Sequence, residues 1–225
     1  MNKIKEYQEI INSKIKQVRI QGKPDELYDP INYILSLKSK RVRPTLSILS
    51  YSLFKEDFNK ITEPSIALEF FHNFTLIHDD IMDNADIRRG KDTIHKKWNK
   101  NIGILSGDLL MIFAYKMLEN VDETIFKNTF KRYNNIAIKV CEGQQYDMNF
   151  EIVNEISEDD YLKMITLKTA VLIGFSLELG GLIANQEKQI TDQLYLAGEK
   201  IGISFQLMDD YLDVFGSDEF GKKIG

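Results

Sequence analysis

Two short stretches of the sequence carry carboxylates in the same arrangement, Asp-Asp-x-x-Asp. They are residues 79–83 (DDIMD) and residues 209–213 (DDYLD), and both interrupt apolar stretches with helical spacing. In a helix, positions i and i+4 lie on one face, about 6 Å apart along the axis. Like charges so placed repel each other and are costly to bury, whereas Mg²⁺ takes hard oxygen ligands and bridges carboxylates to phosphate oxygens. The pair of motifs therefore predicts Mg²⁺-dependent phosphate chemistry; the alternative is two solvated acidic turns.

Two basic clusters accompany the carboxylates. Residues 88–89 are paired arginines five positions after Asp83, and residues 40–44 read KRVRP. The guanidinium group of arginine is a planar fork that matches phosphate oxygens. A basic cluster by itself is more often a solvated surface. Beside paired carboxylate motifs, the two clusters predict two anionic sites, one mediated by metal and one bound directly.

The composition is that of a globular chain in a reducing compartment. Net charge is −5 and 43% of the 225 residues are hydrophobic, so nothing global attracts nucleic acid. The single cysteine, Cys141, excludes an internal disulfide, and we expect it to be a buried structural thiol. Residues 1–16 are charged and amphipathic, unlike a signal peptide. No window approaches 18 uninterrupted apolar residues, so we expect no membrane span and a cytoplasmic location.

Helical spacing of apolar residues dominates the chain, and only four prolines are present. We predict an all-α fold, with residues 1–225 forming a single-domain helical bundle. A basic, irregular stretch is expected over residues 84–101. The expected helices are 62–81, 107–119, 126–150, 158 toward the glycine pair at 180–181, and 191–214. Pro64 is expected in the first turn of helix 62–81. Ser157 is expected to cap the helix that begins at residue 158.

At this point the motifs resemble those of trans-isoprenyl diphosphate synthases, also called polyprenyl synthases. Residues 39–44 (SKRVRP) are similar to their Gly-Gly-Lys-Arg-x-Arg-Pro element, although Ser39 replaces a glycine. Residues 69–90 look like their first aspartate-rich region, and residues 205–216 look like the second. Asp92 stands where the family often has proline. Further matches are Lys168-Thr169, Gly143-Gln144 with Asp147, and Gly221-Lys222.

The resemblance implies a role for each matching residue. Asp79, Asp83 and Asp209 would ligate Mg²⁺ on an allylic diphosphate, supported by Asp80, Asp210 and Asp213. About three Mg²⁺ ions are expected with substrate bound. The allylic diphosphate would be held by Arg88, Lys168 and Lys222, and isopentenyl diphosphate by Lys40, Arg43, His72 and Arg89. The catalytic set would be Lys168, Thr169, Gln206 and Lys222, with Thr169 and Gln206 along the allylic chain.

The implied fold is a helical bundle around a central cavity, and the implied enzyme is a short-chain synthase of the farnesyl or geranylgeranyl type. Such a prenyltransferase of isoprenoid biosynthesis would condense isopentenyl diphosphate with an allylic diphosphate through Mg²⁺-assisted ionisation, without a protein nucleophile. Family members are usually homodimers, and the apolar stretch 107–119 is the expected interface. They continue for several helices past the element at Lys222, so we expect those helices to be missing from residues 1–225.

Product length is expected to depend on the residues before the first motif. Phe74 and Thr75 precede Asp79 by five and four positions, and a bulky aromatic side chain at the first of these resembles the floor of short-chain enzymes. The expected product has fifteen or twenty carbons; the alternative is that Phe74 only packs the core. Two other functions remain open. One is a terpene cyclase, and the other is a non-catalytic subunit of a heteromeric synthase.

Overall fold

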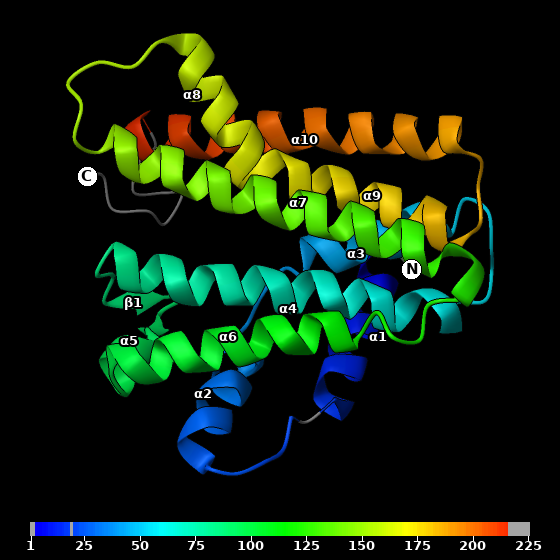
Figure 1. Ribbon diagram of the computed structural model, residues 1–225, viewed down its shortest axis with the longest axis horizontal. Coiled ribbons are helices and arrows are strands. Elements are labelled where there is room, and N and C mark those ends of the chain that lie inside the picture. The colour runs from blue at the N-terminus through cyan, green and yellow to red at the C-terminus, as the bar shows by residue number, and fades with distance from the viewer. Residues whose placement is uncertain (1–2, 19, 216–225) are drawn as a thin grey trace. The chain divides into compact units, whose positions relative to one another are not determined.

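The computed structural model describes residues 3–18 and 20–215 of the chain (Figure 1). It divides into two compact units, unit 1 (Met1–Phe126) and unit 2 (Lys127–Gly225), and each is described by itself. Two of the residues matched to the family, Gly221 and Lys222, lie outside the described residues. The described chain is helical apart from one short hairpin, so the predicted all-α fold is confirmed.

Unit 1 is built around one long helix, α4, which packs against α1, α3, α5 and α6 (Figure 1). Its fully buried side chains include Ile66, Phe70 and Phe71, which anchor the helix in the core. The elements of unit 1 are α1 (Lys3–Gln17), α2 (Asp25–Ser36), α3 (Val42–Tyr51), α4 (Asn59–Met82), β1 (Ile87–Arg88), β2 (Lys91–Asp92), α5 (Ile94–Lys97) and α6 (Lys100–Lys116).

The start of α4 differs from the prediction. The helix begins at Asn59, so Pro64 lies in the second turn and not in the first. The hydroxyl of Thr62 donates to the carbonyl of Phe58 at 2.7 Å, which places Thr62 inside the helix. A threonine in this role resembles a capping residue in the sequence, and this similarity explains the error.

Helix α6 begins seven residues before the predicted start, at Lys100, where the side chain of Asn99 accepts from the backbone of Ile102 at 2.9 Å. Gly103 and Gly107 both lie within this helix. They allow α4 and α6 to approach closely: a Cβ at Gly107 would lie 2.4 Å from the His78 ring. The end of α4 that carries residues 79–83 is thereby fixed against α6.

The stretch predicted as irregular, residues 84–101, contains more structure than expected. Strands β1 and β2 form a two-stranded antiparallel hairpin, and α5 follows it. The hydroxyl of Tyr33 in α2 donates to the carbonyl of Asp92 at 2.9 Å, and that of Thr93 donates to the carbonyl of Ala85 at 2.8 Å. These bonds fix the loop that carries Arg88 and Arg89.

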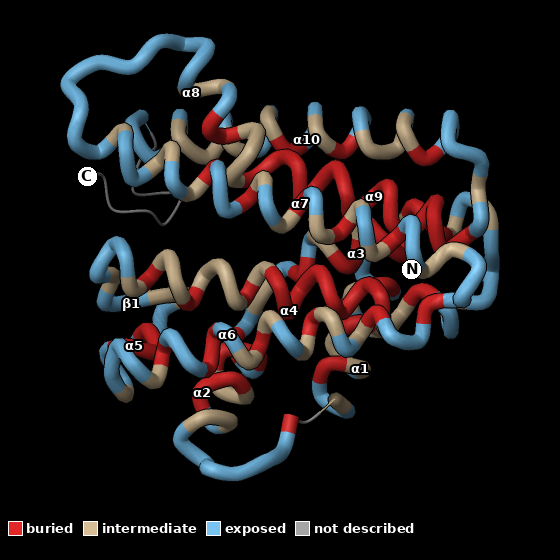
Figure 2. The backbone as a smooth tube through the Cα atoms, in the orientation of Figure 1, coloured by how far each residue is buried: buried red, intermediate tan, exposed pale blue. Residues whose placement is uncertain are grey.

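Unit 2 has α9 as its core element, and every residue of this helix is buried (Figure 2). Helix α10 packs along it, with Gly198 against the backbone of Gly174. A buried carboxylate on α9, Glu178, receives two bonds of 2.7 Å from Arg132 on α7. The bounds are α7 (Glu123–Phe150, beginning at the end of unit 1), α8 (Glu158–Ile165), the one-turn π-helix η1 (Thr166–Ala170), α9 (Val171–Ile183) and α10 (Lys188–Phe215).

Several predictions for unit 2 are decided by this structure. The Ser157 cap is confirmed, because its hydroxyl accepts from the backbone of Asp160 at 3.1 Å. Helix α10 starts at Lys188, three residues earlier than predicted. The prediction for Cys141 is wrong: the residue is exposed on the outer face of α7, next to the buried Val140.

The stretch Glu158–Ile183 is long and apolar enough to cross a membrane when length and composition alone are considered. In the structure 83% of its most apolar window is buried. Buried apolar residues of this kind are typical of the core helix of a globular protein.

Candidate active site

The first aspartate motif lies at the C-terminal end of α4. Asp79 and Asp80 belong to the last turn, and Asp83 directly follows the helix, with its backbone N–H donating to the carbonyl of Asp79 at 2.9 Å. Asp80 is buried and receives the Nε of Arg88 on both carboxylate oxygens, at 2.8 and 2.9 Å. Burial raises the pKa of Asp80 to about 6, although the Arg88 guanidinium acts in the opposite direction. Arg88 also approaches Asp79 at 3.5 Å.

The second motif lies near the C-terminal end of α10, and its middle carboxylate is also held by protein donors. Asp210 accepts from the side-chain amide of Gln206 at 2.8 Å and from the hydroxyl of Tyr161 on α8. Burial and this hydrogen bond raise the pKa of Tyr161 to about 12. In both motifs, therefore, the second aspartate has a structural partner, whereas Asp83 and Asp213 are exposed.

Lys168 and Thr169 lie in the π-helical turn η1. The hydroxyl of Thr169 donates to the side-chain oxygen of Gln206 at 3.0 Å, so the two residues predicted to contact the allylic chain are in contact with each other. The ammonium group of Lys168 pairs with Asp147 on α7 at 2.5 Å. A Cβ at Gly143 would lie 2.2 Å from the backbone nitrogen of Lys168, so the glycine permits this close approach.

Unit 1 brings together three of the four predicted ligands of isopentenyl diphosphate, Arg43, His72 and Arg89. An Nη of Arg43 lies 3.1 Å from Nε2 of His72. Burial, and then the neighbouring arginines, hold the pKa of His72 well below its usual value, so the ring is neutral and accepts from Arg43. Burial also lowers the pKa of Arg43 to about 10, still well above neutral pH. Arg89 donates to Asn73 at 3.5 Å. Lys40 is exposed, and its backbone carbonyl accepts from the side chain of Gln8 at 2.7 Å.

Arg41 and Glu69, which received no role from the sequence, form a buried ion pair beneath this cluster. Arg41 has a left-handed backbone, with φ 48°, and also donates to the carbonyl of Leu35 at 2.6 Å. Glu69 accepts from the side chain of Asn73 at 2.9 Å. A single carboxylate within a run of apolar residues was the available signal, because such a group needs a partner when buried.

Phe74 and Thr75, the predicted chain-length residues, lie on α4 and are half-buried. The ring of Phe74 lies between two others, with centroids 5.6 Å from Phe71 and 4.7 Å from His78. The hydroxyl of Thr75 donates to the carbonyl of His72 at 2.8 Å. Phe74 is therefore less buried than the core residue Phe71, which is 1% exposed.

The chemistry of the aspartates fits magnesium, although the described residues bring no three His, Cys, Asp or Glu side chains close enough to hold a metal ion. Carboxylate oxygens at Asp79 and Asp83, and at Asp209 and Asp213, are the hard ligands that Mg²⁺ prefers. Mg²⁺ commonly takes one or two protein carboxylates and completes its shell with water and substrate phosphate. A carboxylate pair in each unit is sufficient for that mode of binding.

Comparison with known proteins identifies the chain. A sequence model of the family described as Polyprenyl synthetase matches residues 24–225. The chain belongs to the polyprenyl synthetase family. This synthase is 36% identical over 225 residues to geranylgeranyl pyrophosphate synthase of Geoglobus acetivorans, covering 99% of the chain and 70% of the relative. It is 33% identical over 226 residues to geranylgeranyl diphosphate synthase of Methanosarcina mazei, covering 100% of the chain and 70% of the relative.

Solved structures agree with these relatives. A crystal structure of a geranylgeranyl pyrophosphate synthase matches with a TM-score of 0.95 at 45% identity, covering 100% of the chain and 69% of that protein. The synthase thus spans about 70% of the length of the relatives that it matches. The predicted family, the isoprenoid synthase fold and the activity class of a prenyltransferase are confirmed.

Proposed function

We propose that the synthase condenses isopentenyl diphosphate with an allylic diphosphate and that its principal product is geranylgeranyl diphosphate. The observation that carries the proposal lies on α4. His72, with Arg43 and Arg89, forms a direct anion-binding cluster, and Asp79 follows His72 by seven residues, or about 10 Å along the helix. One helix therefore offers two anion sites of different kinds, as a reaction between two diphosphates requires.

The chain's own residues provide binding and orientation. Lys40, Arg43 and Arg89 bind the diphosphate of the isopentenyl substrate, and the neutral His72 holds Arg43 in position. Arg88 and Lys168 offset the negative charge that develops on the departing allylic diphosphate. Thr169 and Gln206 face the developing allylic cation with their oxygens, and the released diphosphate accepts the proton lost after condensation.

Magnesium binding is part of the proposal. Asp79, Asp83 and Asp209 would hold Mg²⁺ with the allylic diphosphate, and when bound the metal supplies Lewis-acid stabilisation of the leaving group. Asp80 and Asp210 support these ligands through the donors that hold them, Arg88 and Tyr161. The exposed Asp213 completes the set, as predicted from the sequence. Lys222 remains a predicted ligand of the allylic diphosphate outside the described residues.

The proposed product length rests on Phe74 and on the names of the relatives. Three of them, including the 45% identical structure, are named as geranylgeranyl synthases. The half-buried ring of Phe74, one turn and a half before Asp79, fits a floor for a twenty-carbon chain. Thr75 lies beside it.

We further propose one domain and a homodimer in the cytoplasm. The family match over residues 24–225 crosses from unit 1 to unit 2, which supports one synthase domain.

The proposed homodimer rests on α6. This helix has three exposed apolar side chains, Ile104, Leu105 and Ile112, which are 43%, 59% and 56% exposed. Apolar side chains gathered on one helix face are typical of an interface between subunits. Light scattering at micromolar concentration should give twice the mass of the chain; a monomer would contradict this proposal.

Product analysis by mass spectrometry tests the activity. The chain is incubated with Mg²⁺, isopentenyl diphosphate and allylic primers of increasing length. We expect elongation that requires both isopentenyl diphosphate and metal and that stops at twenty carbons. A cyclised product formed without isopentenyl diphosphate would indicate a terpene cyclase. Elongation that appears only after addition of a second protein would indicate a subunit of a heteromeric synthase.

A further inference from the structure

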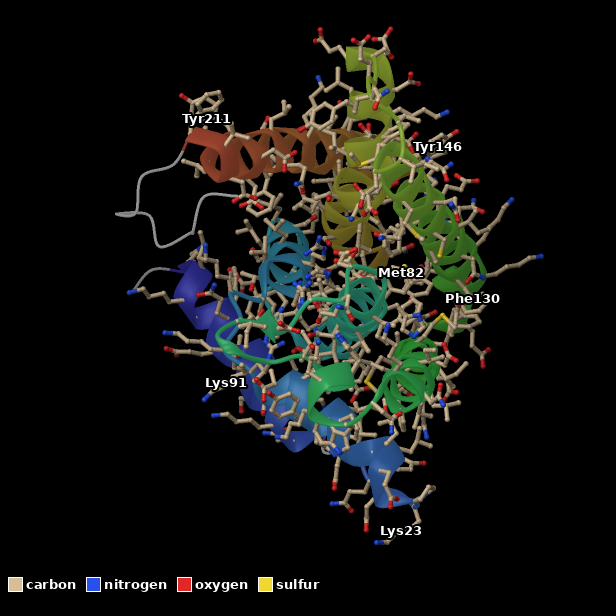
Figure 3. All side chains as sticks on the ribbon, turned by 90° about the vertical axis from the view of Figure 1, so that its left-hand side faces the viewer. Lys23, Met82, Lys91, Phe130, Tyr146 and Tyr211 are labelled. Carbon is tan, nitrogen blue, oxygen red and sulfur yellow. The ribbon has the colours of Figure 1, made fainter. Side chains whose placement is uncertain are left out.

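A cationic pocket lies in unit 1, on the side of the hairpin that faces α2 and α5. Its volume is about 600 Å³, and the residues that matter for its chemistry include Tyr33, Lys38, Arg89, Lys91 and Lys97. Pockets of roughly 300–1,000 Å³ are the usual size for small-molecule sites. Lys91, labelled in Figure 3, belongs to β2 and is exposed.

The charge of this pocket is unusual for the chain that contains it. Four cationic residues line it and one carboxylate, Asp92, accompanies them, in a protein whose net charge is −5. Within the described part of the chain, Lys38, Lys91 and Lys97 form no salt bridge. Several cations around one concave surface concentrate anions, because their potentials add.

The wall of the pocket is held in place by aromatic contacts. The ammonium group of Lys97 lies 3.9 Å from the ring centroid of Tyr33 and 4.9 Å from that of Trp98. The two rings meet edge to face at 5.4 Å. The hydroxyl of Tyr33 donates to the carbonyl of Asp92, which ties α2 to the hairpin. Lys97 and the hairpin are thereby positioned before any ligand arrives.

The pocket differs from the proposed isopentenyl diphosphate site. Of the four residues assigned to that site, only Arg89 lines the pocket; Lys40, Arg43 and His72 do not. An Nη of Arg89 points to Asn73 at 3.5 Å, toward the interior of unit 1. Arg89 therefore forms a shared wall between two cationic surfaces.

We propose that this pocket is an additional anion-binding site that takes the phosphate or diphosphate group of a small ligand. Lysine ammonium groups bind phosphate as point charges and accept a range of orientations. The ring of Tyr33 and the side chain of Leu37 leave an apolar wall for a short hydrocarbon. Two sources share this chemistry: free inorganic diphosphate and the head group of isopentenyl diphosphate.

Calorimetric titration without divalent metal tests the proposal, with inorganic diphosphate and isopentenyl diphosphate as separate ligands. The variants are Lys38→Ala, Lys91→Ala and Lys97→Ala, and the control is Lys55→Ala, which removes an exposed lysine elsewhere in unit 1. We expect each pocket variant to weaken diphosphate binding about threefold to tenfold, as loss of a charged contact does. Lys55→Ala should bind like the parent.

The comparison with Arg43→Ala separates the two sites. Arg43→Ala should weaken a different portion of the binding isotherm from that affected by Lys91→Ala. If only isopentenyl diphosphate responds to the pocket variants, its head group is the ligand; if both respond equally, the ligand is diphosphate in general. Lys38 is exposed, so Lys38→Ala remains informative if Lys97→Ala is destabilised.

Two results would overturn the proposal. One is identical diphosphate binding by the parent and all three pocket variants. The other is loss of the same portion of the isopentenyl diphosphate isotherm in Lys91→Ala as in Arg43→Ala, which would make the pocket part of the substrate site. Because the titration needs no turnover, it remains readable if the proposed synthase activity fails.

Discussion

The guanidinium of Arg41 and the carboxylate of Glu69 lie 2.5 Å apart and are 4% and 1% exposed, so the ion pair is almost completely buried. It joins the loop before α3 to the middle of α4. Glu69 continues the contact to Asn73, and Asn73 accepts from Arg89. The left-handed backbone of Arg41 lies between Lys40 and Arg43, so this pair fixes the segment that carries both proposed phosphate ligands.

Glu69→Ala should therefore destabilise the protein and weaken isopentenyl diphosphate binding. Removing one partner of a buried ion pair typically costs about 3–5 kcal/mol, because the other charge stays buried. Glu69→Gln should cost less, since an amide oxygen still accepts from Asn73. Urea unfolding measures the stability, and the KM for isopentenyl diphosphate should rise more than kcat falls.

Glu63→Ala is the matched control for this prediction, because Glu63 lies on the same helix in a partly exposed pair with Lys14 at 2.9 Å. Pairs of that kind contribute about 0–1 kcal/mol. Equal stability losses at Glu63 and Glu69 would contradict the role assigned to the buried pair.

Asp79→Ala and Asp209→Ala should each reduce turnover while leaving the helical fold intact. The proposed loss of transition-state charge stabilisation corresponds to about 10²–10³-fold in kcat. Steady-state kinetics with saturating Mg²⁺ and circular dichroism give the two readouts. The control is Asp86→Ala, which breaks an exposed pair with Lys96. Parent-like kcat in either motif variant would remove that residue from the proposed metal site.

Phe74→Ala should lengthen the product, because it removes a ring from the path proposed for the growing chain. The product distribution with farnesyl diphosphate as primer, measured by mass spectrometry, should shift beyond twenty carbons. Phe71→Leu is a suitable comparison, since Phe71 is a core residue and the change keeps an apolar side chain. An unchanged distribution in a folded, active Phe74→Ala variant would return Phe74 to a packing role.

His72 should make stability fall as the pH drops below about 6.5. Its pKa in the folded protein lies well below the ordinary value of 6.5, because burial and nearby arginines disfavour the charged ring. Between the two pKa values the unfolded chain binds a proton that the folded chain does not, so acid favours unfolding, with a limiting slope of about 1.4 kcal/mol per pH unit.

The free energy of unfolding of the parent and of His72→Gln, measured in urea at pH 7.5 and 5.5, isolates this contribution. The parent should lose more stability than the variant between the two pH values. His95, whose pKa is also lowered by burial, is present in both proteins and so cancels. If the free energies of unfolding of the parent and of His72→Gln change with pH in parallel, protonation of His72 does not destabilise the folded protein, and the prediction is wrong.

Gly143→Ala should displace the turn that carries Lys168 and Thr169. The new Cβ would lie 2.2 Å from the backbone nitrogen of Lys168 and 2.6 Å from its Cα, and backbone cannot rotate away as a side chain can. Overpacking of this kind costs about 1–3 kcal/mol. We expect lower stability and a lower kcat/KM for the allylic substrate, whereas Asn135→Ala on the exposed face of α7 should change neither. A parent-like Gly143→Ala variant would show that this approach is not required.

The sequence predicted what depends on local spacing. Apolar periodicity predicted the end of α7 at Phe150 correctly, and it predicted the start of this helix to within three residues. The carboxylate spacing identified both aspartate motifs, and the structure places them near the C-terminal ends of α4 and α10. The sequence did not indicate that Tyr161 is the partner of Asp210, which lies 49 positions away. Nor did it indicate that Lys168 pairs with Asp147, which lies 21 positions away. Such contacts depend on how helices pack, and one sequence does not encode them as a pattern.

Cys141 and α6 show the other limit. A lone cysteine is buried in most proteins, but its side of α7 faces outward. The helix predicted from residue 107 begins at Lys100 in the structure, and it contains Gly103 although glycine is a poor helix former. The function of its glycines in packing against Ile81 and His78 becomes visible only with both helices in place.

The π-helical turn Thr166–Ala170 gives this segment one residue more than an α-helix would need to join α8 to α9. A π turn absorbs such a residue without rotating the helices on either side of it, because the wider turn covers about the same rotation as an α turn with one residue fewer. Deletion of one residue here should therefore restore ordinary α geometry and keep Tyr161 facing Asp210. What the deletion changes is the local backbone around Lys168 and Thr169, so the additional residue serves the site and not the packing of α8.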